Sequence, residues 1–409
     1  MIARKQRFNR FLEKDLLKLL KNGYSGLILG PRQVGKTSLV EYFLNSFKNT
    51  HNYFLQNPKT RSDLEKEPEK IIKEVEAMEK EPIIFVDEAQ KAPEIFDAIQ
   101  YLLDKKQAQF ILTGSSARKL RRGGANLLPG RIKRYYLDPL LWGELGLIKE
   151  SHIKKIAMDN INKSDPFSLE NFLVFGSLPG IITLPKREQE SFLKSYALIY
   201  LNEEIRAESL SRKIGAFSRF LELAAQESGT SPNYSKLSNE AGISVQTIKD
   251  YYQLLSDTLV VEIIEPFLKN ARKRILASPK YYFFDLGVRN ALARWPLSKD
   301  TANVQKGVLF EHFVMLEIVR RVRALNKNYK INYWRTSGGA EVDCVIDLGS
   351  EVIPIEIKSS AKVRLGDLKG LKNFLEEYSP LAKTGYVITT GERKQKLSKN
   401  IIALPWNCL

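Results

Sequence analysis

One short segment limits the possible folds of this chain more than any other feature. Residues 30–38 match the pattern G-x-x-x-x-G-K-[ST] and one further serine, and they lie between an apolar run, 26–29, and a helical pattern. In this context the loop N–H groups face the β-phosphate of a nucleotide, Lys36 reaches the β- and γ-phosphate oxygens, and the Thr37 hydroxyl binds Mg²⁺. We therefore expect an α/β domain that binds ATP and Mg²⁺. The residues expected to hold the nucleotide are Gly30, Pro31, Arg32, Gln33, Val34, Gly35, Lys36, Thr37 and Ser38.

A second motif supplies the remaining groups of a hydrolytic site. Residues 83–86 form an apolar run that predicts a buried strand, and Asp87 and Glu88 follow it directly. At this position of a P-loop protein the aspartate holds the metal through water, and the glutamate orients and polarises the attacking water. We assign these roles to Asp87 and Glu88, and we expect the chain to hydrolyse ATP.

Polar side chains also end the next predicted strand, 110–113. We assign Thr113 as a sensor of the γ-phosphate, because its side chain would lie at the carboxyl end of the sheet beside the loop. Ser115 and Ser116 follow it, and they fit a helix cap as well as they fit a nucleotide contact.

An arginine, Arg131, follows a rigid Leu-Pro-Gly segment. Such a residue suits an arginine finger, which enters the ATP site of a neighbouring subunit and stabilises the charge of the transition state. The alternative is a solvated charge in a basic stretch that also contains Arg121, Arg122, Lys133 and Arg134.

The chain divides by periodicity. Apolar runs and helical patterns alternate over residues 25–145, which predicts a parallel sheet, and a polar stretch at 149–165 marks a boundary. Residues 166–268 have a mostly helical period, and strands return after Lys280. Strands are expected at 26–29, 52–55, 83–86 and 110–113, and again at 281–284, 331–334, 342–347, 352–357 and 385–389. We expect three domains: an ATPase domain at 1–150, a helical domain at 165–270 and a second α/β domain at 280–409.

The charge balance points to a polyanionic partner. The 409 residues contain 64 Lys and Arg against 47 Asp and Glu, a formal net charge of +17. This excess favours contact with phosphate backbones, so DNA is the partner that we expect; a basic protein without such a partner is the alternative. No apolar run approaches the ~20 residues that span a bilayer, which predicts a cytoplasmic protein without a membrane segment. Cys344 and Cys408 are too few for a disulfide framework or a cysteine zinc site.

The middle region contains a helix-turn-helix pattern. Residues 235–252 predict two helices joined by a tight turn at Gly242, and a following strand at 260–264 would form the wing of a winged helix. Such a module either reads a DNA groove or serves packing and protein contact. In the first case the side chains that face the groove are Gln246, Thr247 and Lys249.

Carboxylates and a lysine recur near the C-terminus at strand spacing. Asp343 lies on one predicted strand, and Glu356 and Lys358 lie two residues apart on the next, so that the latter two share a face. Two carboxylates can hold Mg²⁺ against a phosphodiester, and the lysine can orient or deprotonate the attacking water. We therefore expect a second, Mg²⁺-dependent hydrolytic site with Asp343 and Glu356 as metal ligands.

The helix predicted upstream of these strands adds a further acid. Glu311 fits a carboxylate of the same site, and Glu317 is the alternative. His312 is interpreted as an ordinary helix residue, and the aromatic run 281–284 as a core strand rather than a base-stacking surface. Basic side chains that either contact a phosphate backbone or face solvent are Arg335, Lys362, Arg364 and Lys369.

Several of these segments together resemble the archaeal-type AAA+ ATPases: the loop at 30–37, residues 85–90, residues 112–116 and Pro129-Gly130-Arg131. The resemblance covers nearly the whole chain, and residues 175–179 are similar to a Gly-Gly-Leu-Pro segment of that family, with Ser177 in place of the second glycine. It implies an AAA+ core followed by a winged helix and a nuclease-like domain of the DUF4143 type. It also implies a homo-oligomeric ring, a hexamer.

The C-terminal pattern resembles the PD-(D/E)xK nuclease superfamily, with Val342 in place of the usual proline. This resemblance implies activity on branched or four-way junction DNA, because relatives of that fold include junction resolvases. The fold class that we expect is α/β, with a P-loop AAA+ ATPase domain, a helical winged-helix middle region and a restriction-endonuclease-like C-terminal domain. The alternative function is an ATP-dependent switch or motor that binds nucleic acid or protein without cutting.

Overall fold

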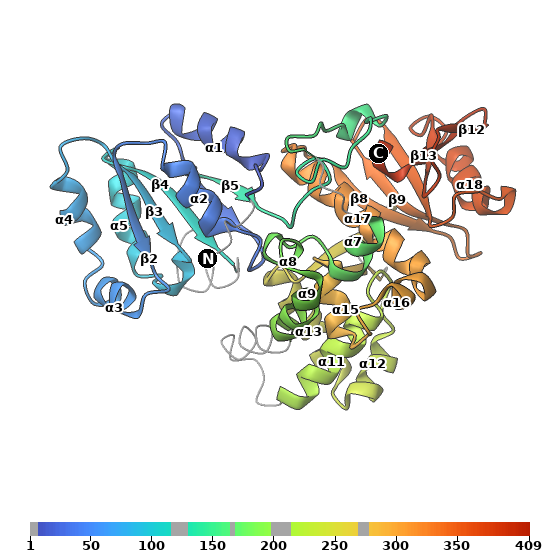
Figure 1. Ribbon diagram of the computed structural model, residues 1–409, viewed down its shortest axis with the longest axis horizontal. Coiled ribbons are helices and arrows are strands. Elements are labelled where there is room, and N and C mark those ends of the chain that lie inside the picture. Colours follow the sequence, from blue (N-terminus) through green and yellow to red (C-terminus); the bar gives the residue numbers. More distant parts are fainter. Residues whose placement is uncertain (1–6, 116–129, 164–167, 198–213, 269–277) are drawn as a thin grey trace. The chain divides into compact units, whose positions relative to one another are not determined.

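The computed structural model describes residues 7–115, 130–163, 168–197, 214–268 and 278–409 (Figure 1). The chain forms two compact units, one of residues 9–139 with 254–260 and the other chiefly of residues 140–253 and 261–409. The first boundary therefore falls at Pro139, earlier than the polar stretch suggested. The helical and C-terminal regions, which we expected as separate domains, form one unit.

The first unit is built on a five-stranded sheet with the order β2-β3-β4-β1-β5, in which every neighbouring pair is parallel. The four strands predicted here are confirmed at nearly the expected positions. The strands are β1 (Ser25–Leu29), β2 (Thr50–Phe54), β3 (Ile83–Asp87), β4 (Gln109–Gly114) and β5 (Ile132–Tyr136). The helices are α1 (Leu12–Lys21), α2 (Lys36–Leu44), α3 (Pro58–Lys66), α4 (Lys70–Glu76), η1 (Ala89–Lys91) and α5 (Ile95–Asp104).

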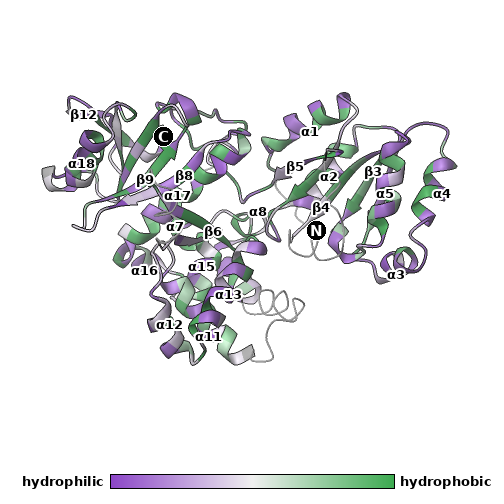
Figure 2. Ribbon diagram, turned by 180° about the vertical axis from the view of Figure 1, so that it is seen from behind, coloured by the Kyte–Doolittle hydropathy of each residue, from purple (hydrophilic) through white to green (hydrophobic). Residues whose placement is uncertain are grey.

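Burial explains which strands the sequence reveals. Every residue of β1 and β3 is buried, so these strands are continuous apolar runs, and Figure 2 shows hydrophobic colouring concentrated in the sheet. Among the described strands β5 pairs only with β1, and it exposes Lys133, Arg134 and Tyr136, so it lacks an apolar run and was not predicted. In a parallel sheet the carboxyl ends of β1, β3 and β4 meet at one edge, and the P-loop, Asp87 and Gly114 therefore lie together.

The second unit begins with helices. They are η2 (Lys154–Ile156), α7 (Leu169–Phe175), α8 (Pro179–Ile182), α9 (Lys186–Ser195), α11 (Ile214–Gln226), α12 (Tyr234–Ala241) and α13 (Val245–Asp257). The predicted helix-turn-helix is confirmed as two helices, α12 and α13, joined at Gly242, whose φ of 68° is left-handed. Ser244 accepts a hydrogen bond from the Thr247 N–H at 3.1 Å and so caps α13.

An eight-stranded sheet forms the rest of this unit, with the order β12-β13-β11-β10-β9-β8-β6-β7. The strands are β6 (Val261–Pro266), β7 (Lys280–Phe283), β8 (Lys330–Arg335), β9 (Glu341–Asp347), β10 (Val352–Lys358), β11 (Gly385–Thr389), β12 (Gln395–Ser398) and β13 (Ile401–Pro405). The remaining helices are α15 (Leu286–Leu292), α16 (Lys299–Val304), α17 (Lys306–Ala324), η4 (Leu365–Leu368), α18 (Lys369–Glu377) and η5 (Trp406–Cys408).

The strand that we expected to form a wing belongs to this sheet. Strand β6 pairs antiparallel with β7, as a wing hairpin would, but its last residues Glu265 and Pro266 also pair parallel with Asn332 and Tyr333 of β8. The helical region and the C-terminal sheet are therefore continuous through β6. None of the helices within the described ranges combines the length and apolarity that a bilayer-spanning segment requires.

Candidate functional sites

The P-loop runs from the end of β1 to the start of α2, and two glycines explain its shape. A Cβ at Gly30 would lie 2.2 Å from the carbonyl oxygen of Leu137, so no other residue fits there. Gly35 has a φ of 93°, which an L side chain rarely adopts. The loop can therefore bring its N–H groups to the helix start, where an anion binds most favourably.

The lysine and threonine of the loop lie as the sequence suggested, beside the end of β3. The buried Lys36 ammonium donates to the carbonyls of Gly30 and Pro31 at 2.8 and 2.9 Å, and it lies 4.0 Å from Glu88 Oε1. The Thr37 hydroxyl donates to Asp87 Oδ1 at 2.8 Å. Thr37 and Asp87, the two residues that we expect to hold Mg²⁺, are therefore in direct contact.

Thr113 lies between the two acidic residues rather than facing outward. Its fully buried hydroxyl donates to Asp87 Oδ1 at 2.7 Å and accepts the Glu88 N–H at 3.0 Å. The hydroxyl therefore donates one hydrogen bond to residue 87 and accepts one from residue 88. These contacts indicate that Thr113 positions the acidic pair; its role as a sensor of the γ-phosphate stays a prediction.

Glu88 is held in an unusual conformation. Its backbone is left-handed, with φ 56° and ψ 48°, which is uncommon for a residue other than glycine and is found where function requires it. One carboxylate oxygen, Oε2, accepts from Gln90 Nε2 at 2.5 Å and from the Ser115 hydroxyl at 2.9 Å. Ser115 therefore contacts the proposed catalytic glutamate and does not only end the strand; Ser116 lies outside the described residues.

Burial raises the pKa of Asp87, although the hydrogen bonds from Thr113 and Thr37 oppose the rise. A nearby cation would favour the ionised carboxylate. The position of Asp87 therefore suits a metal ligand, since Mg²⁺ prefers carboxylate and hydroxyl oxygens.

Arg10 could not be identified as a site residue from the sequence. Its buried guanidinium donates to the Val34 carbonyl in the P-loop at 2.9 Å and to the Asp138 carbonyl after β5 at 2.6 Å. An isolated arginine ahead of the first helix has no distinctive pattern, so only the fold reveals that it ties the loop to the segment beyond β5.

Arg131 lies at the amino-terminal ends of the parallel strands, whereas the P-loop lies at their carboxyl ends. It precedes β5, whose first residues pair with the first residues of β1, whereas the loop follows the last residue of β1. The exposed Arg131 guanidinium contacts Asp104 at the end of α5, with 2.5 Å between Nε and Oδ1. This arginine does not reach the ATP site of its own sheet. Residues 121 and 122 lie outside the described residues.

The second constellation lies on β9 and β10 and at the start of α17. Asp343 is buried and accepts the Ile357 N–H at 2.7 Å, which fixes it against β10. Lys358 donates to Glu356 Oε1 at 2.7 Å. Glu356 is only 6% exposed, so water cannot readily satisfy its other oxygen, Oε2. This buried oxygen has no hydrogen-bond partner among the described residues.

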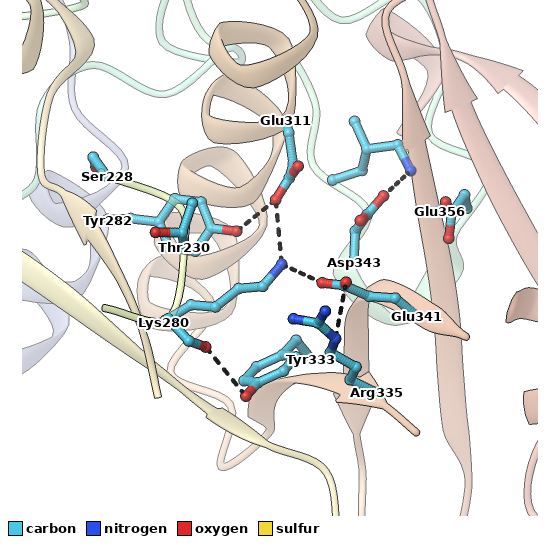
Figure 3. Close-up of polar contacts among 12 residues, drawn as sticks. Ser228, Thr230, Lys280, Tyr282, Glu311, Tyr333, Arg335, Glu341, Asp343 and Glu356 are labelled. Atoms are coloured by element: carbon cyan, nitrogen blue, oxygen red, sulfur yellow. Dashed lines mark hydrogen bonds and ion pairs between the residues drawn. The ribbon is translucent and has the colours of Figure 1, made fainter. Parts of the chain in front are cut away.

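Strand β7 completes this site with two residues that the sequence did not identify. Tyr282 donates to Glu311 Oε1 at 2.8 Å, and the Lys280 ammonium lies 3.6 Å from the same oxygen and 2.7 Å from Glu341 Oε1. Figure 3 shows Lys280 between Glu311 and Glu341, with Asp343 and Glu356 beside them. Lysines on exposed strand edges are common, and only the pairing of β7 shows that this one points inward.

The carboxylates repel one another. Burial, followed by the charges of Glu311 and Glu356, raises the pKa of Asp343 well above its usual value. Burial also raises the pKa of Glu356, against the influence of Lys358. A divalent cation would relieve this repulsion and would occupy the unpartnered Glu356 oxygen. Among the described residues, however, no three His, Cys, Asp or Glu side chains already converge as a metal site.

Two other residues of α17 have structural contacts. The alternative acid, Glu317, is buried, accepts from Arg321 Nε at 2.7 Å and accepts the Trp142 N–H, so it is not available to the site. His312 is buried, with Nε2 2.7 Å from the Phe283 carbonyl, and burial lowers its pKa to about 3. It is therefore a neutral core residue.

The proposed nucleic-acid contacts are exposed. Gln246 donates to Asp250 at 2.9 Å and the Lys249 ammonium lies 5.5 Å from the Tyr234 ring, so both side chains lie on the surface of α13. Arg335 approaches Glu341 at 3.9 Å beside the acidic site. Lys362 and Lys369 lie farther along the chain, and the Arg364 N–H caps η4 by bonding to Asp367.

Comparison with known proteins divides the chain into three family regions. Residues 24–146 match the sequence model of the AAA domain, and residues 306–409 match DUF4143, a domain of unknown function. Residues 167–299 match a further domain of unknown function, DUF8612. This last match ends beyond β7, so it includes the strands that join the helical region to the sheet.

Relatives extend over most of the chain. The uncharacterised protein Rv2008c of Mycobacterium tuberculosis is 25% identical over 386 residues, which cover 93% of this chain and 79% of the relative. The uncharacterised protein MJ1637 of Methanocaldococcus jannaschii is 25% identical over 437 residues, covering 98% and 86%. Among solved structures, the Walker-type ATPase PABY2304 of Pyrococcus abyssi is 18% identical with a TM-score of 0.48, covering 71% of this chain and 97% of that one. At a TM-score this low a shared overall fold is not shown.

Proposed function

Because the chain belongs to the AAA+ ATPases that carry a C-terminal DUF4143 domain, we propose that it is an ATP-hydrolysing, DNA-binding enzyme whose C-terminal site cleaves phosphodiester bonds with Mg²⁺. The observation that carries the hydrolysis of ATP is the direct contact of Thr37, Asp87 and Thr113 beside the P-loop. The observation that carries cleavage is the buried, unpartnered oxygen of Glu356 beside Asp343.

In the ATPase site each residue has a separate task. The Lys36 ammonium would move from the loop carbonyls to the β- and γ-phosphates, and Thr37 and Asp87 would hold Mg²⁺, which supplies positive charge to the transferring phosphate. Glu88 would accept a proton from the attacking water. Its Oε2 is already bound by Gln90 and Ser115, which leaves Oε1 to face the reacting groups.

In the C-terminal site Asp343 and Glu356 would hold Mg²⁺, which supplies a Lewis acid at the scissile phosphate. Two protein carboxylates suffice, because Mg²⁺ commonly keeps several waters and takes further oxygens from the substrate. Lys358, already 2.7 Å from Glu356, would orient the attacking water and offset the charge that develops on the phosphate. Glu311, on α17, would add a further carboxylate to this site.

The partner and the assembly are further parts of the proposal. The net charge of +17 and the exposed α13 residues Gln246 and Lys249 support DNA binding, with branched or four-way junction DNA as the substrate. The position of Arg131, away from its own ATP site, supports a homo-oligomeric ring, a hexamer in which this arginine enters the site of the next subunit.

A second function is favoured by one specific observation. Lysines already contact three of the four carboxylates of the C-terminal site, since Lys358 binds Glu356 and Lys280 binds Glu311 and Glu341. A site neutralised in this way could serve as a structural platform. The chain would then be an ATP-dependent switch or motor that binds nucleic acid or a protein without cutting it.

One assay separates the two functions. The purified chain is incubated with linear, forked and four-way DNA in Mg²⁺ or Mn²⁺, with and without ATP, and DNA binding is measured in parallel. Nicking that is lost in Asp343→Asn and Glu356→Gln, while ATP turnover is retained, is the result that we expect. Binding controlled by ATP without any nicking would instead support the switch. Nicking that survives Asp343→Asn with the same metal dependence would reject the assigned cleavage site.

A further inference from the structure

Lys280 has a position in the C-terminal site that neither the nuclease-like motif nor the family regions assign. It comes from β7, which lies at the edge of the sheet, pairs with β6 alone among the described strands, and precedes every strand of the motif. Its side chain is 8% exposed, and its ammonium lies 2.7 Å from Glu341 Oε1 and 3.6 Å from Glu311 Oε1. A lysine is seldom buried without such partners.

We propose that Lys280 is a fixed counter-ion that keeps divalent metal away from Glu311 and Glu341 and so limits the site to one ion, held by Asp343 and Glu356. The inference rests on the proposed cleavage function and specifies its metal stoichiometry. It assigns Lys280 a positioning role, because the lysine acts through the carboxylates and does not touch the reacting atoms.

The contacts distinguish the two carboxylate pairs. Glu311 Oε1 receives both Lys280 and the Tyr282 hydroxyl, and Glu341 receives Lys280 on one oxygen and lies 3.9 Å from Arg335 on the other. A metal ion at this pair would have to displace a buried ammonium and leave that charge without a partner, which is strongly unfavourable. Lys280 thus already supplies a cation to both Glu311 and Glu341.

The other pair retains free coordination capacity. Glu356 Oε2 has no partner among the described residues, and Asp343 is fixed by one backbone N–H, from Ile357, so that its remaining lone pairs can bind an ion. In Figure 3 the dashed contacts of the Lys280 ammonium lead to Glu311 and Glu341, and none leads to Asp343 or Glu356. The site therefore has one pair closed by a protein cation and one pair open to a metal cation.

The test counts bound Mn²⁺, which does not depend on cleavage. Free Mn²⁺ is measured by electron paramagnetic resonance during titration of the full chain with MnCl₂, without nucleotide. Every protein carries Asp87→Asn, so that the ATPase site does not contribute. We expect one Mn²⁺ per chain for this reference protein and two when Lys280→Met is added, because the carboxylates of Glu311 and Glu341 become free.

Matched variants control for the change of charge and for folding. Lys330→Met removes an exposed lysine at the start of β8, where Lys330 lies opposite Asp347 of β9, and should leave the count at one. Lys280→Arg keeps the cation and should also leave it at one. If Lys280→Met does not fold, Glu341→Gln gives a second reading in the reference protein. The Mn²⁺ dissociation constant should change less than threefold, because Glu341 is not a ligand.

The outcomes separate the inference from the proposed function. A count of one in both the reference protein and Lys280→Met, or of two in both, overturns the role of Lys280. A tenfold loss of Mn²⁺ affinity in Glu341→Gln overturns it as well. A count of zero that rises to one in Lys280→Met supports the counter-ion but rejects Asp343 and Glu356 as a metal site, and with them the cleavage function. A count of zero in both rejects the two together.

Discussion

Replacing Thr113 with valine should destabilise the ATPase unit even when no nucleotide is bound. Valine has nearly the same shape, but it removes the donor to Asp87 at 2.7 Å and the acceptor for the Glu88 N–H at 3.0 Å. A hydrogen bond to a charged group contributes about 1.5–3 kcal/mol, and a buried unpaired N–H costs about 1–3 kcal/mol. Asp87 keeps its bond from Thr37, and the added methyl group recovers about 1 kcal/mol by burial.

The net expected loss is about 2–4 kcal/mol of the free energy of unfolding, or roughly 10 °C in the melting midpoint of this unit. The assay is thermal unfolding of Thr113→Val without nucleotide, with Thr113→Ser as the control that restores the hydroxyl and most of the stability. ATP turnover should fall in parallel, since Glu88 loses its support. An unchanged melting midpoint combined with lost turnover would refute this reasoning and return Thr113 to the role of a γ-phosphate sensor.

Other predictions address the remaining residues of the two units. Lys36→Ala should abolish ATP turnover and weaken nucleotide binding, whereas Glu88→Gln should keep ATP bound and slow hydrolysis by at least about 100-fold, because an amide cannot accept the proton of water; equal turnover by wild type and Glu88→Gln would reject that assignment. Mixing Arg131→Ala subunits with Lys36→Ala subunits should restore part of the turnover, and no recovery at any ratio would count against a finger acting between subunits. His312, whose pKa is lowered to about 3 from 6.5, stays neutral in the folded chain while the unfolded chain binds a proton below pH 6.5, so folding loses stability as pH falls from 6.5 towards 3. Chemical denaturation of wild type should therefore show about 2 kcal/mol more loss between pH 8 and pH 5 than His312→Gln shows, and identical slopes would contradict the buried neutral state.

The local sequence pattern was sufficient to predict the strands that are completely buried. The strands β1, β3 and β4 carry unbroken apolar runs, and the residues that follow them face the same edge in any parallel sheet, so the P-loop and Asp87 could be placed together from the sequence. The same reasoning brought Asp343, Glu356 and Lys358 to one region. In each case strand periodicity determines which side chains are neighbours.

Contacts between distant segments could not be predicted in this way. Arg10 reaches Val34 and Asp138, and Lys280 reaches Glu311 and Glu341, because helices and strands remote in sequence pack together. The joining of the helical and C-terminal regions into one compact unit could not be predicted for a related reason. The pairing of β6 with β8 rests on a few backbone contacts near Pro266, and no side-chain pattern records it.

The direction in which a side chain points could not be predicted from the local sequence pattern either. Thr113 ends a strand at the expected edge, yet its hydroxyl turns inward because both Asp87 and the Glu88 N–H require a partner in a region closed to water. Glu317 is one helical turn and more beyond Glu311, and the rotation places it against Arg321 and Trp142 instead of the acidic site.

The charges of the two sites lead to the same expectation about how tightly each site binds Mg²⁺. In the ATPase site Asp87 and Glu88 face one lysine, Lys36, and neutral groups supply the other contacts, so the site carries one excess negative charge when both carboxylates are ionised. The C-terminal site holds four carboxylates against Lys280, Lys358 and the more distant Arg335, which again leaves one excess negative charge. A divalent ion alone would leave either site positive, and a phosphate group brings the compensating negative charge. Each site should therefore bind its metal more tightly when the phosphate substrate is present, ATP in one and a DNA backbone in the other.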